Sequence, residues 1–102
     1  MDKIEHLLTC AIEECAEVQH AVTKTLRFGL EDYYESGPTN QERIMLEFCD
    51  LLAVIEELVS MGVLAFPANK NELLAGKKEK IKKYMTYAEA RGTLDFKGGE
   101  HV

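Results

Sequence analysis

Apolar residues recur at helical spacing along three long segments of the chain, with polar residues between them. The pattern predicts helices over residues 3–28, 40–61 and 70–91. The second helix carries a main apolar stripe between residues 44 and 59, yet Met45 and Leu46 lie outside that stripe. A helix that is apolar on several sides needs more than one neighbour to cover it. We therefore expect the helices to pack against one another and against a further surface.

Both ends of each predicted helix carry a recognisable signal. The starts resemble capping boxes, in which a side chain accepts a hydrogen bond from the backbone N–H three residues later: Asp2-x-x-Glu5, Thr39-x-x-Glu42 and Asn69-x-x-Glu72. A glycine follows each end, where it suits a left-handed cap: Gly29, Gly62 and Gly92. These signals predict one domain over residues 1–92 and a flexible tail over residues 93–102.

The predicted fold class is all-α. Helices of this length extend about 30–40 Å at 1.5 Å per residue. Three helices of this length leave much apolar surface uncovered in a chain of 102 residues. We therefore expect a bundle of long antiparallel helices that is completed by homodimerisation, with a tetramer left open.

Composition and charge narrow the classes of partner. With 46% hydrophobic and 29% charged residues, the chain resembles ordinary globular proteins. The net charge of −6 disfavours a nucleic acid as partner, because phosphates repel an acidic surface. No apolar run approaches the ~18 residues of a membrane span, so no membrane partner is expected. The first residues lack the pattern of a secretory signal, which favours a cytoplasmic location.

Four carboxylates form two pairs, Glu14 with Glu17 and Glu47 with Asp50, and the members of each pair share one helical face. If the two helices pack together, each like-charge pair costs about 3 kcal/mol at ~6 Å and an effective dielectric of ~20. A bound cation or bound protons must offset that repulsion. Oxygen ligands favour Mg²⁺, with Mn²⁺ as a substitute. Spacing alone also allows a solvated acidic face, since Arg43 falls near the line of Glu47 and Asp50.

The order of these acidic residues resembles a family signature. The segment Glu13-Glu14-Cys15-Ala16-Glu17, followed by Glu47-Phe48-Cys49-Asp50, has the form EExxE…ExxD. This is similar to the MazG-like all-α nucleoside triphosphate pyrophosphohydrolases, whose superfamily includes dimeric dUTPases and phosphoribosyl-ATP pyrophosphatases. The resemblance covers roughly residues 5–92, and it includes the segment 24–29 and the lysine-rich third helix. The interval from residue 18 to residue 46 is long for the family.

The resemblance implies roles for individual residues. It implies Mg²⁺ ligands at Glu14, Glu17, Glu47 and Asp50. It implies catalytic roles for Glu14 and for its neighbour Glu13, which would orient a water molecule or support an additional metal. The expected substrate-binding residues are Lys24, Arg27, Lys78 and Lys82. Lys24 continues the carboxylate face of the first helix about two turns beyond Glu17, and Lys78 and Lys82 are one turn apart.

We therefore expect a Mg²⁺-dependent enzyme that hydrolyses a nucleoside triphosphate, or a modified nucleotide, to the monophosphate and pyrophosphate. The aromatic side chains Phe28, Tyr33, Tyr34, Tyr84 and Tyr87 could stack on a base, or they could pack in a core or a dimer. Two alternatives stay open. One is a non-catalytic helical module whose function is the dimer itself. The other is a hydrolase of the phosphoribosyl-ATP pyrophosphatase type.

Overall fold

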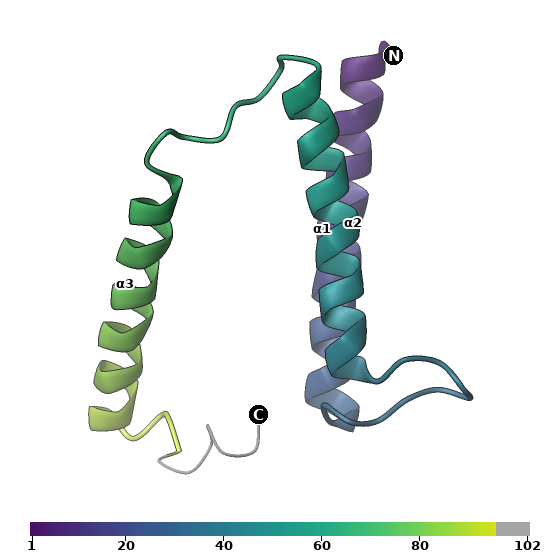
Figure 1. Ribbon diagram of the computed structural model, residues 1–102. Helices are drawn as coiled ribbons and strands as arrows, with labels where there is room; N and C mark the ends of the chain where they lie inside the picture. The colour runs from purple at the N-terminus through teal and green to yellow at the C-terminus, as the bar shows by residue number, and fades with distance from the viewer. Residues whose placement is uncertain (96–102) are drawn as a thin grey trace. The chain divides into compact units, whose positions relative to one another are not determined.

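A computed structural model describes residues 1–95 and contains three helices. These are α1 (Lys3–Phe28), α2 (Asn40–Ser60) and α3 (Lys70–Ala90) (Figure 1). The part of the chain that the structure describes has no strand, only one isolated antiparallel bridge between Tyr33 and Thr39. The prediction of an all-α chain is confirmed. Helices α2 and α3 each end one residue earlier than expected, because Met61 and Arg91 act as caps.

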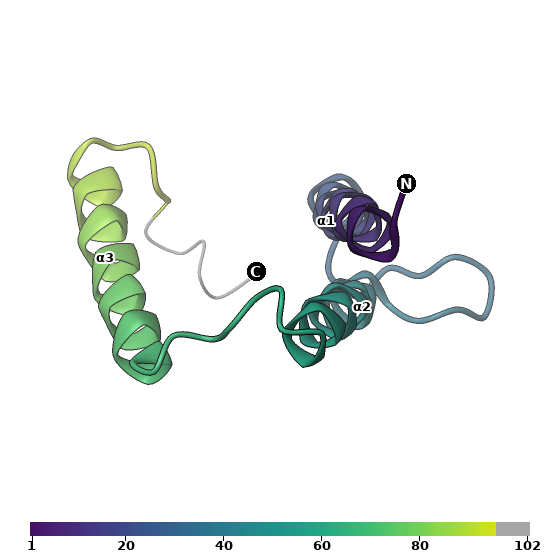
Figure 2. The same ribbon diagram turned by 90° about the horizontal axis from the view of Figure 1, so that it is seen from above.

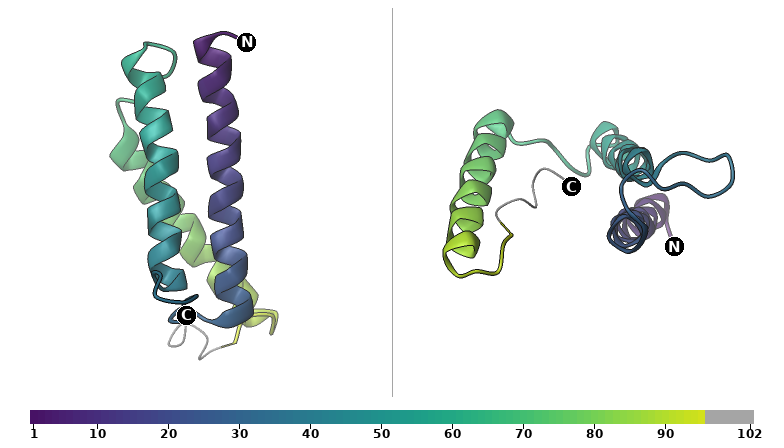
Figure 3. Two further views of the ribbon diagram at one scale, coloured as in Figure 1. Left: turned by 90° about the vertical axis from the view of Figure 1, so that its right-hand side faces the viewer. Right: turned by 90° about the horizontal axis from the view of Figure 1, so that it is seen from below.

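The chain divides into two compact units, Met1–Ala65 and a second unit that begins at Phe66. In the first unit α1 and α2 lie side by side and run in opposite directions (Figures 1 and 2). The residues from 29 to 39 form a long loop at one end of this helix pair (Figure 3). The second unit contains α3. A single domain over residues 1–92 stays a prediction, and residues 96–102 of the expected tail lie outside the described residues.

The helix starts follow the sequence signals at two of the three expected positions. The Asp2 side chain accepts from the Glu5 N–H at 2.8 Å, and Thr39 and Glu42 form a reciprocal capping box. The expected cap at Asn69 is wrong, because its side chain makes no capping hydrogen bond. Asn69 has φ −98° and ψ 32°, whereas a side chain that caps a helix usually extends from a β-region backbone.

The helix ends use glycine in two different ways. Gly62 follows α2 with φ 76°, and the N–H groups of Gly62 and Val63 donate to the carbonyls of Val59 and Leu58. This is a left-handed cap of the Schellman type, as expected. Gly29 was expected to cap α1 in the same way, but its φ of 99° and ψ of 157° lie outside the left-handed helical region. The chain instead leaves α1 in a conformation that leads directly into the loop.

Helices α1 and α2 meet along a seam whose positions alternate by four and three residues, as in a coiled coil. On α1 the partly or fully buried seam residues are Leu7, Ala11, Glu14, Val18, Ala21 and Thr25. On α2 they are Ile44, Glu47, Leu51, Val54 and Leu58. Ala21 is 4% exposed and Leu58 is fully buried. The seam therefore forms the core of the first unit, and two of its positions carry glutamate.

A second apolar stripe of α1 lies beside the seam instead of within it. Ile4, Leu8 and Val22 are each about 40% exposed. Phe48 of α2 is similarly exposed. Apolar side chains therefore remain uncovered along the flank of the seam.

Among residues 1–95, none of the three helices is both long and apolar enough to cross a bilayer.

Because Leu58 fills the most buried position of the seam, we expect Leu58→Ala to lower the free energy of unfolding by about 2–5 kcal/mol. Leu26→Ala is the matched control, since the Leu26 side chain is 83% exposed and should change stability by no more than about 0.5 kcal/mol. Urea unfolding followed by circular dichroism measures both variants. Equal effects of the two substitutions would contradict the seam as the core of this unit.

Candidate functional site

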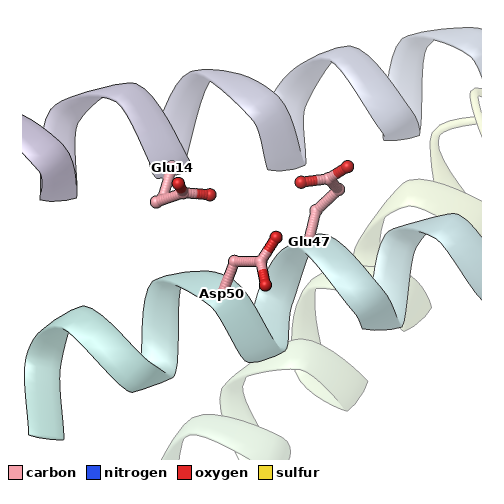
Figure 4. A group of neighbouring side chains, drawn as sticks. All are labelled: Glu14, Glu47 and Asp50. Atoms are coloured by element: carbon pink, nitrogen blue, oxygen red, sulfur yellow. The ribbon is translucent and has the colours of Figure 1, made fainter.

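Three carboxylates from the two packed helices come together in the middle of the seam. Glu14 belongs to α1, and Glu47 and Asp50 belong to α2. One carboxylate oxygen from each residue lies within 4.8 Å of the corresponding oxygens of the other two. Figure 4 shows the Glu14 side chain pointing from α1 toward α2, and the other two pointing back toward α1. We call this group the carboxylate cluster.

The cluster exists because Glu14 and Glu47 occupy seam positions. Ala11, three residues before Glu14, and Val18, four residues after it, both pack in the seam. Glu47 stands between Ile44 and Leu51 in the same way. Both glutamates are therefore partly buried, whereas Asp50 stands at the edge of the seam and is exposed. Packing of the helices fixes the cluster's position and limits its contact with water.

The pKa of Glu14 is raised above its ordinary value of 4.5. The largest cause is partial burial, which removes water from the charged carboxylate. Repulsion adds to it, in decreasing order, from Asp50, Glu47, Glu17 and Glu13. The cluster thus favours whatever reduces its negative charge, whether a proton or a bound cation.

Arg43 supplies a positive charge beside the cluster. One guanidinium nitrogen lies 4.0 Å from a Glu47 carboxylate oxygen, one helical turn away on α2. The Arg43 side chain is 47% exposed, and such an ion pair contributes about 0–1 kcal/mol. One arginine also leaves two of the three carboxylate charges uncompensated. A solvated acidic face would also contain an ion pair of this kind. The pair does not neutralise the carboxylate cluster.

The fourth expected ligand, Glu17, lies outside the tight group. It is exposed on the flank of α1, one turn beyond Glu14. There it lines a cavity of about 250 Å³ together with Lys24 of α1 and with Arg43 and Glu47 of α2. Glu13 is exposed beside Glu14. The roles of Glu17 as a ligand and of Glu13 in catalysis stay predictions.

We call this space the ionic cavity, because most of its lining is charged. His20 and Ala21 complete the lining. Lys24 therefore lines the same cavity as Glu47, one member of the cluster. Arg43 and His20 were not proposed as site residues from the sequence. The available signal for Arg43 was its position four residues before Glu47, which places both on one face of α2.

Three further residues are expected to bind phosphate, namely Arg27, Lys78 and Lys82. The Arg27 guanidinium sits 4.7 Å from the ring centre of Phe28, in a cation–π contact at the end of α1. Lys78 and Lys82 belong to the second unit, where they are exposed one turn apart on α3. Phosphate binding by these three residues stays a prediction.

The oxygen donors of the cluster suit a hard divalent cation. Two ligands of one Mg²⁺, each about 2.1 Å from the ion, are at most about 4.2 Å apart. Oxygens within 4.8 Å of one another therefore need only small side-chain rotations to share one ion. The site contains no sulfur ligand, and carboxylates alone favour Mg²⁺ or Mn²⁺ over softer metals.

Comparisons of the chain with protein-family models, with curated proteins and with solved structures find no match. The resemblance to MazG-like enzymes therefore rests on the motif residues alone and stays a prediction.

The raised pKa of Glu14 predicts a pH dependence of stability without metal. Between 4.5 and the higher folded-state pKa, the folded protein binds more protons than the unfolded chain, so stability falls as pH rises. Glutamine has no charge, so Glu14→Gln removes the cost of ionising residue 14 in the folded protein. We therefore expect the variant to become more stable than the unmodified protein as pH rises through that interval. Urea unfolding with a chelator, at pH values on both sides of 4.5, measures the difference.

Glu56→Gln is the matched control for that experiment, because Glu56 is an exposed glutamate of α2 outside the cluster. It should show no comparable gain. A Glu14→Gln profile that runs parallel to the unmodified protein at all pH values would rule out the repulsive cluster.

Proposed function

We propose that this protein is a Mg²⁺-dependent nucleotide pyrophosphohydrolase of the MazG-like type. The observation that carries the proposal is the convergence of Glu14, Glu47 and Asp50 from two helices on one point of a packed seam. A seam position normally holds an apolar side chain, and carboxylates there lower stability unless they bind something. The motif that suggested the family supplies all three of these residues.

The ligand set that we propose is Glu14, Glu47 and Asp50, with Glu17 added from the flank of α1. When bound there, Mg²⁺ would neutralise charge on the phosphate oxygens and help to align the substrate. Mn²⁺, which also prefers oxygen ligands, is the expected substitute. Glu13, which is exposed next to Glu14, would orient the attacking water.

The phosphate chain would lie in the ionic cavity. Lys24 and Arg43 face this space from opposite helices, and Glu17 and Glu47 join it to the carboxylate cluster. An ammonium and a guanidinium bind phosphate oxygens well, and the arginine can bind two of them at once. Hydrolysis between the first and second phosphates would then yield the monophosphate and pyrophosphate.

We also propose that the active form is a homodimer. The helix pair of the first unit buries little apolar surface, and Ile4, Leu8 and Val22 of α1 remain exposed beside the seam. On α2, Met45 and Leu46 are 59% and 52% exposed. A second copy of the chain would cover such surfaces with a symmetric interface. The same surfaces would serve the alternative of a non-catalytic helical module.

We expect Glu47→Gln and Asp50→Asn each to abolish Mg²⁺-dependent release of pyrophosphate, because each removes one charged ligand from the cluster. The measurement is a panel of nucleoside triphosphates with phosphoribosyl-ATP included, each assayed with and without Mg²⁺. Glu56→Gln serves as the control, since it removes an exposed charge from the same helix. Preference for phosphoribosyl-ATP would shift the assignment to that branch of the superfamily.

Calorimetric titration of Mg²⁺ into the nucleotide-free protein separates the enzyme from the alternative module. Saturable binding that Glu47→Gln removes supports the metal centre. No saturable binding, together with no hydrolysis of any nucleotide in the panel, would favour the interaction module.

The dimer gives a separate prediction. Light scattering at micromolar concentration should give a mass of at least twice the 11.5 kDa of one chain. A folded monomer under the same conditions would contradict the dimer. It would not affect the proposal of a metal centre, which the Mg²⁺ titration tests separately.

A further inference from the structure

A second cavity of the first unit lies between the end of α1, the loop over residues 29–39 and the start of α2. Its volume is about 280 Å³. Its lining includes Lys24, Phe28, Asp32, Tyr33, Asn40 and Arg43. We call it the loop cavity. Its chemistry differs from that of the ionic cavity, because aromatic side chains form much of its wall.

Two residues line both cavities, Lys24 from α1 and Arg43 from α2. The loop cavity and the ionic cavity are therefore neighbours that share a pair of cations. Arg43 lies between them, with one guanidinium nitrogen 4.0 Å from Glu47 and the other near Gly37 of the loop. Along this side of the helix pair, the order is carboxylate cluster, cationic pair and aromatic wall.

The base of the loop is held in place by hydrogen bonds to the first turn of α2. The backbone N–H of Asn40 donates to the carbonyl of Asp32, and that of Gln41 donates to the carbonyl of Leu30, both at 2.9 Å. The Asn40 side-chain amide donates to the Gly29 carbonyl at 2.8 Å. The loop is thus anchored on both sides of the cavity. Asp32 and Tyr33 of this anchored loop line the cavity together with Phe28.

The wall offers aromatic faces and hydrogen-bond acceptors together. Tyr33 and Phe28 are 60% and 55% exposed, so neither ring is buried in a core. The Arg27 guanidinium covers one face of the Phe28 ring, which leaves the other face for a ligand. Asp32 contributes a carboxylate. The Asn40 amide group donates to Gly29, which leaves its side-chain oxygen as an acceptor. A flat ligand with N–H donors on its edge fits this combination.

We propose that the loop cavity binds the base of the nucleotide, and that it favours a base with adjacent N–H donors, of the guanine type. The inference rests on the proposed function, because the cationic pair would hold the phosphates that connect the base to the cluster. Stacking on Phe28 or Tyr33 would bind any base. The Asp32 carboxylate, with two acceptor oxygens, pairs best with the two neighbouring donors of guanine. Uracil offers one donor between two carbonyl oxygens, which a carboxylate repels.

The experiment is calorimetric titration of the full-length protein with non-hydrolysable triphosphates that carry guanine, hypoxanthine or uracil, in the presence of Mg²⁺. Inorganic tripolyphosphate is the probe without a base. We expect guanine to bind most tightly, hypoxanthine less tightly because it lacks the amino group, and uracil most weakly. Amide chemical shifts from two-dimensional NMR of the same samples report where each ligand binds.

Three variants test individual contacts of the loop cavity. Tyr33→Leu should weaken binding of all three nucleotides by about 5- to 100-fold, and Tyr33→Phe, which keeps the ring, should retain most of the affinity. Asp32→Asn should reduce the preference for guanine over uracil by about tenfold or more. None of these should weaken the binding of tripolyphosphate, which also verifies that the variants are folded. Lys24→Ala, in contrast, should weaken the binding of tripolyphosphate and of every nucleotide.

The outcomes separate this inference from the proposed function. Hydrolysis with equal affinity for all three bases, unchanged in Tyr33→Leu, would overturn the base site and leave the pyrophosphohydrolase standing. Guanine-selective binding that depends on Asp32, without hydrolysis of any triphosphate, would support the base site and overturn the proposed reaction. Shifted amides confined to other parts of the chain would also overturn the base site.

Discussion

Repulsion among three carboxylates in the helix seam is the constraint on which the first unit depends. Glu14 and Glu47 stand where a coiled-coil pattern would place apolar residues, and Asp50 adds a third charge within 4.8 Å. The few apolar contacts of the seam, centred on Ala21 and Leu58, must hold the helices together against that repulsion. A divalent cation in the cluster would convert it into an attraction between α1 and α2. Metal binding and helix packing are then one equilibrium, since a ligand that binds only the folded state stabilises it.

The helices could be predicted from the sequence because their signals are local. Apolar spacing and flanking caps placed α1 at its observed bounds and the other two helices within one residue. The cap at Asn69 failed because it depends on the backbone angles of that residue, which the sequence pattern does not determine. The cap at Gly29 differs for the same reason, since the path of the following loop decides its ψ angle.

Only part of the candidate site could be predicted from the sequence. The motif identified all three members of the cluster, but it grouped Glu17 with them, and the structure places Glu17 on the neighbouring flank. An apolar pattern omits Glu14 and Glu47, so the seam positions that these two glutamates occupy became visible only in the structure. The loop cavity could not be foreseen at all. It depends on hydrogen bonds from Asn40 to residues about ten positions earlier, which no local pattern reveals.

The glutamates of the seam have a further consequence for how the two helices recognise each other. A coiled-coil seam repeats every seven residues, so an antiparallel pair with a uniformly apolar seam can slide by one repeat at little cost. Here such a slide would carry Glu14 to the place where Leu7 or Ala21 now packs, and would move it away from Glu47 and Asp50. The observed alignment brings the acidic positions of both helices to the same level. A divalent cation that binds all three carboxylates would therefore select this register, although the same residues weaken the seam without it.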